Sequence, residues 1–128
     1  MANNTNSTTL GDAIREARSG AGIRLRKLAS DLSLTPSYIS DIENDRRVPS
    51  EEVLQSIAKK LGLDFDYLMA LAGRFGEKTE RYVRRNPTAG VLFRRISESN
   101  LQEDDLRRLL DEAERLKLEK EKDSERIP

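Results

Sequence analysis

The stretch that decides the fold of this chain is residues 24–44, with the sequence RLRKLASDLSLTPSYISDIEN. It predicts two short helices, over about residues 24–31 and 36–43, joined by a tight turn. Thr35 is a good N-cap for the second helix, and Pro36 occupies its first position, where the missing N–H costs nothing. Apolar residues at helical spacing predict the interface between the two helices: Leu28, Ala29, Leu32, Leu34, Ile39 and Ile42.

The second helix of this pair has a polar outer face. Ser37, Tyr38 and Asp41 fall outside the apolar interface and are expected to face outward. Two helices joined by a short turn, with the second one exposed, form a helix-turn-helix, whose second helix is offered to the major groove of DNA. The sequence therefore predicts a DNA-binding motif.

Three further helical segments surround this pair. Ser50 and Asp64 are suited to begin helices, and Gly62 and Gly73 to end them. Five helices with short connections and no strand signal predict a compact all-α domain over residues 10–73. The expected helices are 10–19, 24–31, 36–43, 51–61 and 65–72, and the polar residues 1–9 are expected to form a disordered tail.

After Gly73 the pattern changes to short basic helices over 77–85 and 88–98, separated by Asn86 and Pro87. A long amphipathic helix is then expected to run to about residue 120. Its apolar stripe, the leucine stripe, consists of Leu101, Leu106, Leu109, Leu110, Ala113 and Leu116. Residues 74–120 are thus predicted to be a helical segment for dimerisation or interaction, and residues 121–128 a charged, frayed tail.

The composition excludes several classes of function. The 128 residues include no Cys and no His, so disulfides, zinc sites of the usual N/S type and His- or Cys-based catalysis are excluded. No paired carboxylates or phosphate-binding loop indicate another catalytic site, and we expect no catalytic residues, no metal and no cofactor. No apolar run reaches the length of a membrane span. A cytoplasmic protein is the expectation.

The net charge is zero overall but unevenly distributed. Residues 1–73 carry a net charge of −1, residues 74–97 of +5, and residues 98–128 of −4. A near-neutral domain lacks the basic face that DNA-binding domains usually present. Two interpretations of the basic middle segment stay open: it supplies the DNA affinity that the domain lacks, or it pairs with the acidic tail.

Several short sequence signatures, each different from the others, are distributed along residues 10–68. They are Leu10-Gly11, Ile14-Arg15, Leu28-Ala29, Ser37-Tyr38-Ile39-Ser40, Ile42-Glu43-Asn44, Pro49-Ser50, Ile57-Ala58 and Leu61-Gly62. Their spacing closely resembles the helix-turn-helix domain of the XRE family, shared by lambdoid phage repressors and Cro. The resemblance covers about half of the chain. It implies an all-α fold, with a five-helix lambda-repressor-like DNA-binding domain followed by an α-helical C-terminal segment.

The resemblance places the base-reading positions of the family on Pro36, Ser37, Tyr38 and Asp41. Pro36 offers only an apolar contact to a thymine methyl group, and Ser37 a hydroxyl of weak discrimination, whereas Asp41 could accept from cytosine N4. Two alternatives stay open. For Tyr38, the alternative is partial burial between the second and third helices. For Asp41, the alternative is an ordinary solvated carboxylate.

The resemblance also implies contacts to the phosphate backbone, from the loop after the third helix and from the start of the second helix. The alternative is that these polar groups and cations belong to an ordinary surface. The residues concerned are Asn44, Arg46 and Arg47 in the loop, and Arg24, Arg26 and Lys27 in the second helix.

In phage repressors of this family, an Arg near the end of the first helix pairs with the Glu that ends the third. Arg18 and Glu43 stand at the matching positions. The resemblance therefore implies a structural ion pair that fixes the recognition helix against the rest of the domain.

One short helix-turn-helix covers too little of a groove to be specific, so such domains normally bind as dimers to paired half-sites. The leucine stripe is the predicted dimer element, because no other large apolar face remains to cover it. The alternative is that the long helix folds back on its own domain through Val91, Leu92 and Phe93.

The leading hypothesis is a sequence-specific transcriptional regulator, a dimeric repressor in which the helix starting at Pro36 reads operator half-sites in double-stranded DNA. The second is an antitoxin or adaptor that binds a protein partner through its C-terminal helices and only autoregulates on DNA. A protein antagonist or companion protease is a further partner that the resemblance implies. No membrane partner is expected, and an enzyme finds no support in the residues.

Overall fold

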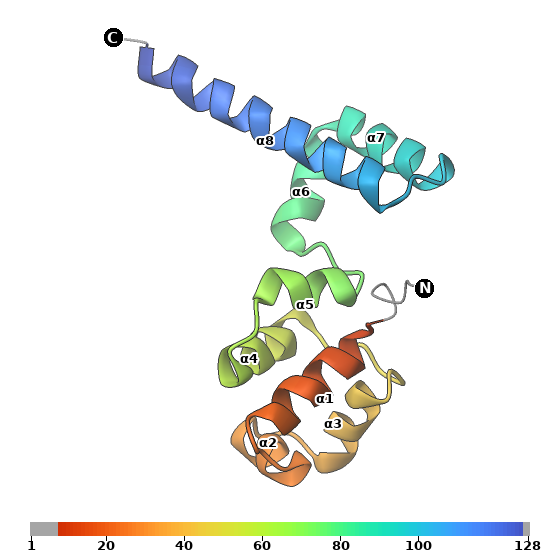
Figure 1. The fold of residues 1–128 in the computed structure, drawn as a ribbon, viewed down its shortest axis with the longest axis vertical. Helices are drawn as coiled ribbons and strands as arrows, with labels where there is room; N and C mark the ends of the chain where they lie inside the picture. Colours follow the sequence, from red (N-terminus) through yellow and green to blue (C-terminus); the bar gives the residue numbers. More distant parts are fainter. Residues whose placement is uncertain (1–7, 127–128) are drawn as a thin grey trace. The chain divides into compact units, whose positions relative to one another are not determined.

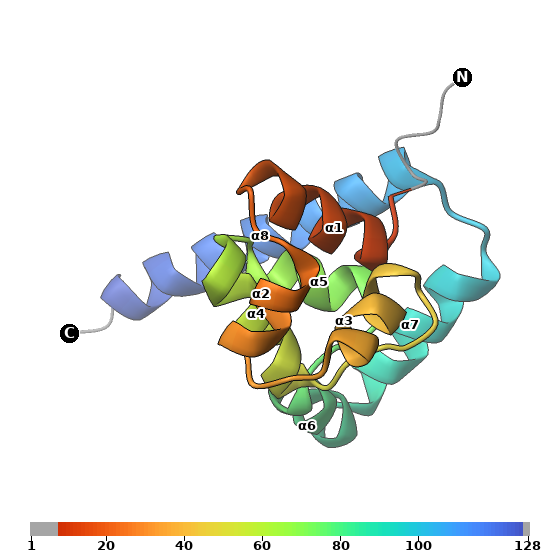
Figure 2. The same ribbon diagram turned by 90° about the horizontal axis from the view of Figure 1, so that it is seen from below.

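The computed structural model describes residues 8–126, and all regular structure within this range is helical (Figures 1 and 2). The predicted all-α fold class is therefore confirmed. None of the described helices has the length and apolarity needed to cross a membrane. The helices are α1 (Leu10–Gly20), α2 (Leu25–Asp31), α3 (Pro36–Glu43), α4 (Glu51–Leu61), α5 (Phe65–Leu71), α6 (Glu77–Arg85), α7 (Pro87–Glu98) and α8 (Glu103–Arg126).

The chain divides into two compact units after Glu80, within α6, and each unit is described by itself. A domain boundary after Gly73 stays a prediction. The first unit contains α1 to α5, in which α1 contacts both α3 and α4, α2 packs on α3, and α4 packs on α5 (Figure 2). The helix-turn-helix pair α2–α3 is thus held by α1, which α4 and α5 support.

Two buried clusters hold this unit together. The smaller one lies between α2 and α3 and consists of Leu28, Ala29 and Ile39, all fully buried. Burying each of the larger side chains stabilises the fold by about 1.5–3 kcal/mol. The larger cluster joins α1, α3, α4 and α5 and consists of Leu10, Ile14, Ile42, Leu54, Ile57, Ala58, Leu68 and Met69.

The helices begin at residues whose side chains accept hydrogen bonds from free backbone N–H groups. Thr35 Oγ1 accepts from the Tyr38 N–H at 3.1 Å, and Ser50 and Asp64 cap α4 and α5 in the same way. Gly62 ends α4 with φ 69°, a left-handed conformation that glycine adopts without strain. These three N-caps and this helix end confirm the prediction from the sequence.

Two predictions about the ends of the chain are wrong. Thr9, which was expected to lie in the disordered tail 1–9, is the N-cap of α1 and forms a capping box with Asp12; residues 1–7 of that tail lie outside the described residues. Residues 121–126, expected to fray, continue α8 to Arg126. Glu and Lys are good helix formers, which outweighs the lack of apolar residues there. Residues 127–128 are outside the described range.

Asp31, the last residue of α2, ties α2 to α4. Its Oδ2 accepts from Lys60 Nζ at 2.9 Å and its Oδ1 from Lys27 Nζ at 3.0 Å. The hydrogen bonds from Lys60 and then Lys27 lower the pKa of the Asp31 carboxyl. Because this pKa is lower in the folded than in the unfolded state, the stabilisation is present above the unfolded pKa. This stabilisation is lost as the pH falls through the pKa of Asp31 in the folded state.

The second unit buries very little of its surface. Among its described residues, α7 and α8 contain no buried residue, and the same holds for α6. Val91, Leu92 and Phe93 of α7 remain about half exposed, at 53%, 50% and 46%. A pair of helices with so little buried apolar surface has little to hold it together in water.

In the first unit, α1 crosses the end of α3 at very close range. A Cβ atom at Gly11 would lie 2.4 Å from the carbonyl oxygen of Glu43. This contact is between backbones, so no flexible side chain can move to relieve it. Gly20, at the other end of α1, has open space where a Cβ would lie.

We expect Gly11→Ala to lower the free energy of unfolding by about 1–3 kcal/mol or more, because the methyl group forces α1 and α3 apart. The matched control is Gly20→Ala, which should be neutral or stabilise the helix by up to about 1 kcal/mol. Urea denaturation followed by circular dichroism measures both. Equal stabilities of the two variants would contradict the close approach.

Candidate nucleic-acid interface

Helix α3 is anchored by its inner face and open on its outer face. Ile39 and Ile42 are fully buried, whereas Pro36 and Ser37 at the start of the helix are exposed. Asp41, one turn after Ser37, is half-buried. The leading edge of the helix therefore presents a proline ring, a hydroxyl and a carboxylate, groups that can meet base edges in a major groove.

Tyr38 is only partly available at this edge. The residue is half-buried and packs against the larger core cluster. Arg47 lies over its ring, with the guanidinium carbon 5.0 Å from the ring centroid, a cation–π arrangement. A base-reading role for Tyr38 remains a prediction.

Two side chains of the loop after α3 are engaged within the protein. Arg46 Nε donates to Asp41 Oδ1 at 3.2 Å. Asn44 Nδ2 donates to the Ser40 carbonyl at 2.8 Å, so its amide helps to end the helix. Their contacts to phosphate also remain predictions.

The cations at the start of α2 lie on the surface. Arg24 is the N-cap residue of α2, where its side chain forms no capping hydrogen bond, and Arg26 is exposed. Lys27 pairs with Asp31 one turn later. Of the three, Arg24 and Arg26 are therefore the better candidates for a phosphate contact.

The side chains of Arg18 and Glu43 form a nearly buried ion pair between α1 and the end of α3. Arg18 Nε donates to Glu43 Oε2 at 2.6 Å and Arg18 Nη2 to Oε1 at 3.0 Å, a bidentate geometry. A further bond runs from Arg18 Nη1 to the carbonyl of Ile23 at 2.8 Å. The side chains are only 14% and 3% exposed. The hydrogen bond that Arg18 donates to Glu43 raises the pKa of the Arg18 guanidinium, so Arg18 stays charged at any physiological pH.

Four residues that the sequence analysis did not place in the site support it. Arg15 Nη2 donates to the Glu43 carbonyl at 2.5 Å. Asp45 Oδ1 accepts from the Gly11 N–H at 2.9 Å, and its Oδ2 from the Thr9 hydroxyl at 2.6 Å. Asp45 therefore joins the loop after α3 to the start of α1. Of these residues, only Arg15 could have been found from the sequence, because it lies one turn before Arg18 on the same helix face.

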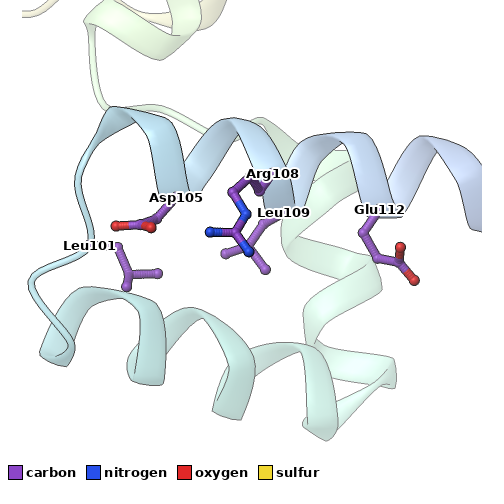
Figure 3. A pocket seen from close by; sticks show the side chains of 5 residues that line it. All are labelled: Leu101, Asp105, Arg108, Leu109 and Glu112. Carbon is purple, nitrogen blue, oxygen red and sulfur yellow. The ribbon is translucent and has the colours of Figure 1, made fainter.

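The leucine stripe of α8 lies on the surface of the second unit. Leu106, Leu109, Leu110 and Leu116 keep between 40% and 55% of their surface exposed. Leu101 is half-buried, and Ala113 is exposed. A shallow pocket along α8 combines apolar and charged side chains (Figure 3): Leu101, Asp105, Arg108, Leu109 and Glu112.

The described residues offer no other obvious site. Between residues 8 and 126, no group of three or more acidic side chains is placed to hold a metal ion. The polar outer edge of α3 and the cations around it are thus the best candidate for a functional surface in the first unit.

A family model described as a helix-turn-helix domain matches residues 11–74, half of the chain and the segment that contains α1 to α5. The chain belongs to this family. Like its relatives of the XRE type, this helix-turn-helix protein is a DNA-binding transcriptional regulator.

Several transcriptional regulators are similar to part of this chain. The transcriptional regulator ClgR of Mycobacterium tuberculosis is 33% identical over 78 residues, which cover 61% of this chain and 70% of ClgR. The regulator DdrOP3 of Deinococcus deserti is 34% identical over 68 residues, 53% of each chain. The crystal structure of ClgR from C. glutamicum is 34% identical, covers 50% of this chain and 83% of its own, and has a TM-score of 0.44.

Replacing Arg18 with Met should leave the Glu43 carboxylate buried without its main partner. We expect a loss of about 3–5 kcal/mol in the free energy of unfolding, measured by urea denaturation at neutral pH. Arg18→Met with Glu43→Leu should recover most of this loss, because neither charge is then buried.

The same substitution at an exposed position, Arg26→Met, is the matched control and should change stability by less than about 0.5 kcal/mol. An Arg18→Met variant as stable as the control would show that the pair contributes nothing to holding α3.

Proposed function

We propose that this regulator is a dimeric repressor that reads operator half-sites with α3. The observation that supports this most is the combination of a firmly held helix with an open leading edge, at which Pro36 and Ser37 are exposed and Asp41 is half-buried. In this proposal the double-stranded DNA is the partner, α3 lies in the major groove, and the chain catalyses no reaction. Because its proposed partner is DNA, we also propose that the protein acts in the cytoplasm.

The proposal assigns the two sets of cations to the phosphate backbone. Arg46 and Arg47 follow α3, and Arg24 and Arg26 begin α2, so the sets lie on both sides of the helix-turn-helix in sequence. Contacts of this kind fix the register of the protein on the duplex and make its affinity depend on salt. Base edges are left to the side chains of α3.

Dimerisation in this proposal uses the leucine stripe of α8. The described part of α8 has no buried residue, and the four leucines of the stripe that lie on this helix are 40–55% exposed. Apolar patches of this kind mark interaction surfaces. A second copy of the chain is the occupant we propose, because a single helix-turn-helix contacts too few base pairs for specific binding.

The second candidate function, an antitoxin or adaptor, uses the same exposed surface for a different protein. Val91, Leu92 and Phe93 of α7 add to the exposed apolar area, which favours a partner larger than one helix. Co-purification distinguishes the two candidates: a stoichiometric foreign protein on the second unit supports the adaptor, and a clean homodimer supports the repressor.

The DNA-binding roles predict two kinds of mutant. Arg24→Ala should weaken binding to all duplexes alike and reduce the salt slope by about 1, because a phosphate contact is lost. Ser37→Ala should instead change the preference among sequences at one base position. The measurement is fluorescence anisotropy over a salt series, with a duplex selected by the full-length protein from a randomised pool and with a random duplex.

A wild-type protein that binds no selected duplex more tightly than random DNA would overturn the proposed function. If Arg24→Ala and Ser37→Ala had the same effect on both duplexes, the division between phosphate contact and base contact would be wrong.

The dimer is tested by placing a charge within the leucine stripe. Leu109→Asp should weaken self-association at least about tenfold, because an unpaired carboxylate would be buried in the interface. Leu118→Asp is the matched control, since Leu118 lies on α8 at the opposite side of the helix and is 59% exposed. Sedimentation equilibrium gives the molar mass. A wild-type monomer, or equal effects of both substitutions, would contradict the assignment.

A further inference from the structure

The loop after α3 begins with a backbone motif that sets Arg46 beside the last turn of the helix. The Arg46 N–H donates to the Asp41 carbonyl at 2.8 Å, and the Asp45 N–H to the Ile42 carbonyl at 3.1 Å. These are the two hydrogen bonds of a Schellman motif, with Asp45 in the left-handed conformation at φ 58°. The backbone of Arg46 therefore lies next to Asp41, whatever conformation the Arg46 side chain adopts.

The side chains of the same two residues also meet. Arg46 Nε lies 3.2 Å from Asp41 Oδ1, and the two side chains are 62% and 38% exposed. Arg46 is thus bound to Asp41 twice, once through the backbone and once through the guanidinium. Asp41 stands one turn after Ser37 on the outer face of α3, the face that the proposed function turns toward DNA.

This pair conflicts with binding to DNA. An Arg46 guanidinium that is bound to Asp41 is less available to a phosphate oxygen, and a carboxylate close to DNA is repelled by phosphates. A carboxylate that loses its water in the groove needs a hydrogen-bond donor. In the major groove the base-edge donors are the amino groups of cytosine N4 and adenine N6.

We propose that Asp41 and Arg46 form an exchange pair that separates specific from non-specific DNA. On a duplex with an amino group at the right position, the carboxylate accepts from that base and Arg46 moves to a phosphate. On other duplexes Asp41 keeps Arg46, and the phosphate contact is not made. Asp41 then contributes specificity by holding back a cation as well as by touching a base. This inference rests on the proposed function and adds a mechanism of selection to it.

The contrast with Arg47 supports this division of roles. Arg47 lies over the neutral ring of Tyr38, and a cation held in that way keeps its hydrogen-bond donors for a phosphate. Of these two loop arginines, Arg46 is the one whose side chain pairs with a carboxylate, whereas Arg47 lies over an aromatic ring. The exchange is therefore specific to the Asp41–Arg46 pair.

The test uses full-length variants Asp41→Ala, Arg46→Ala and the double substitution, with the selected and random duplexes over a salt series. Asp41→Ala should tighten binding to random DNA, by up to about fivefold through the release of Arg46. It should also raise the salt slope on random DNA by about 0.9, one phosphate contact. Its preference for the selected duplex should fall at least about fivefold.

Arg46→Ala should lower the salt slope on the selected duplex by about 0.9 and leave that on random DNA unchanged. In the Arg46→Ala background, Asp41→Ala should no longer raise the slope on random DNA. The matched control is Asp66→Ala, which removes the same charge from α5. It should leave both slopes and the preference as in the wild type, and melting curves confirm that each variant is folded.

The exchange is overturned if Asp41→Ala leaves the slope and affinity on random DNA unchanged, or changes them equally with and without Arg46. In either case wild-type selectivity would persist and the proposed function would stand. A wild type that selects no sequence at all would instead remove the proposed function itself.

Discussion

The position of α3, the helix that we propose to read DNA, depends on how its end is held against α1. The Glu43 carboxylate is 3% exposed and is bound by both donors of the Arg18 fork. A carboxylate buried without such a partner would cost several kcal/mol, so the two helices keep a fixed relation as long as the pair is intact. Gly11 allows the backbones to approach closely at the same point. The orientation in which we propose that α3 enters a groove is set by these contacts.

The sequence predicted the first unit well because its signals are local. Thr35, Ser50 and Asp64 act through N–H groups two or three residues away, and the buried residues of α3 follow the 3.6-residue period. The Arg18–Glu43 pair came from the family resemblance, since 25 positions separate the two residues and no local pattern connects them.

The residues that support the site could not be predicted from the sequence, and the reason is physical. Asp45 adopts a left-handed conformation, and its contacts to Gly11 and Thr9 are with residues far away in the sequence, so no local pattern pointed to them. The Asp41–Arg46 pair likewise follows from the turn that ends α3 and not from spacing along a helix. At the chain ends, Thr9 was assigned to a tail on composition, although its hydroxyl caps α1.

The contact between Thr9 and Asp45 has a practical consequence for anyone who handles this protein. It places the start of α1 beside the loop after α3, to which we assign phosphate contacts, because Asp45 directly precedes Arg46. An affinity tag fused immediately ahead of Thr9 would therefore crowd the surface whose affinity is being measured. Purification handles belong at the other end of the chain or behind a cleavable spacer.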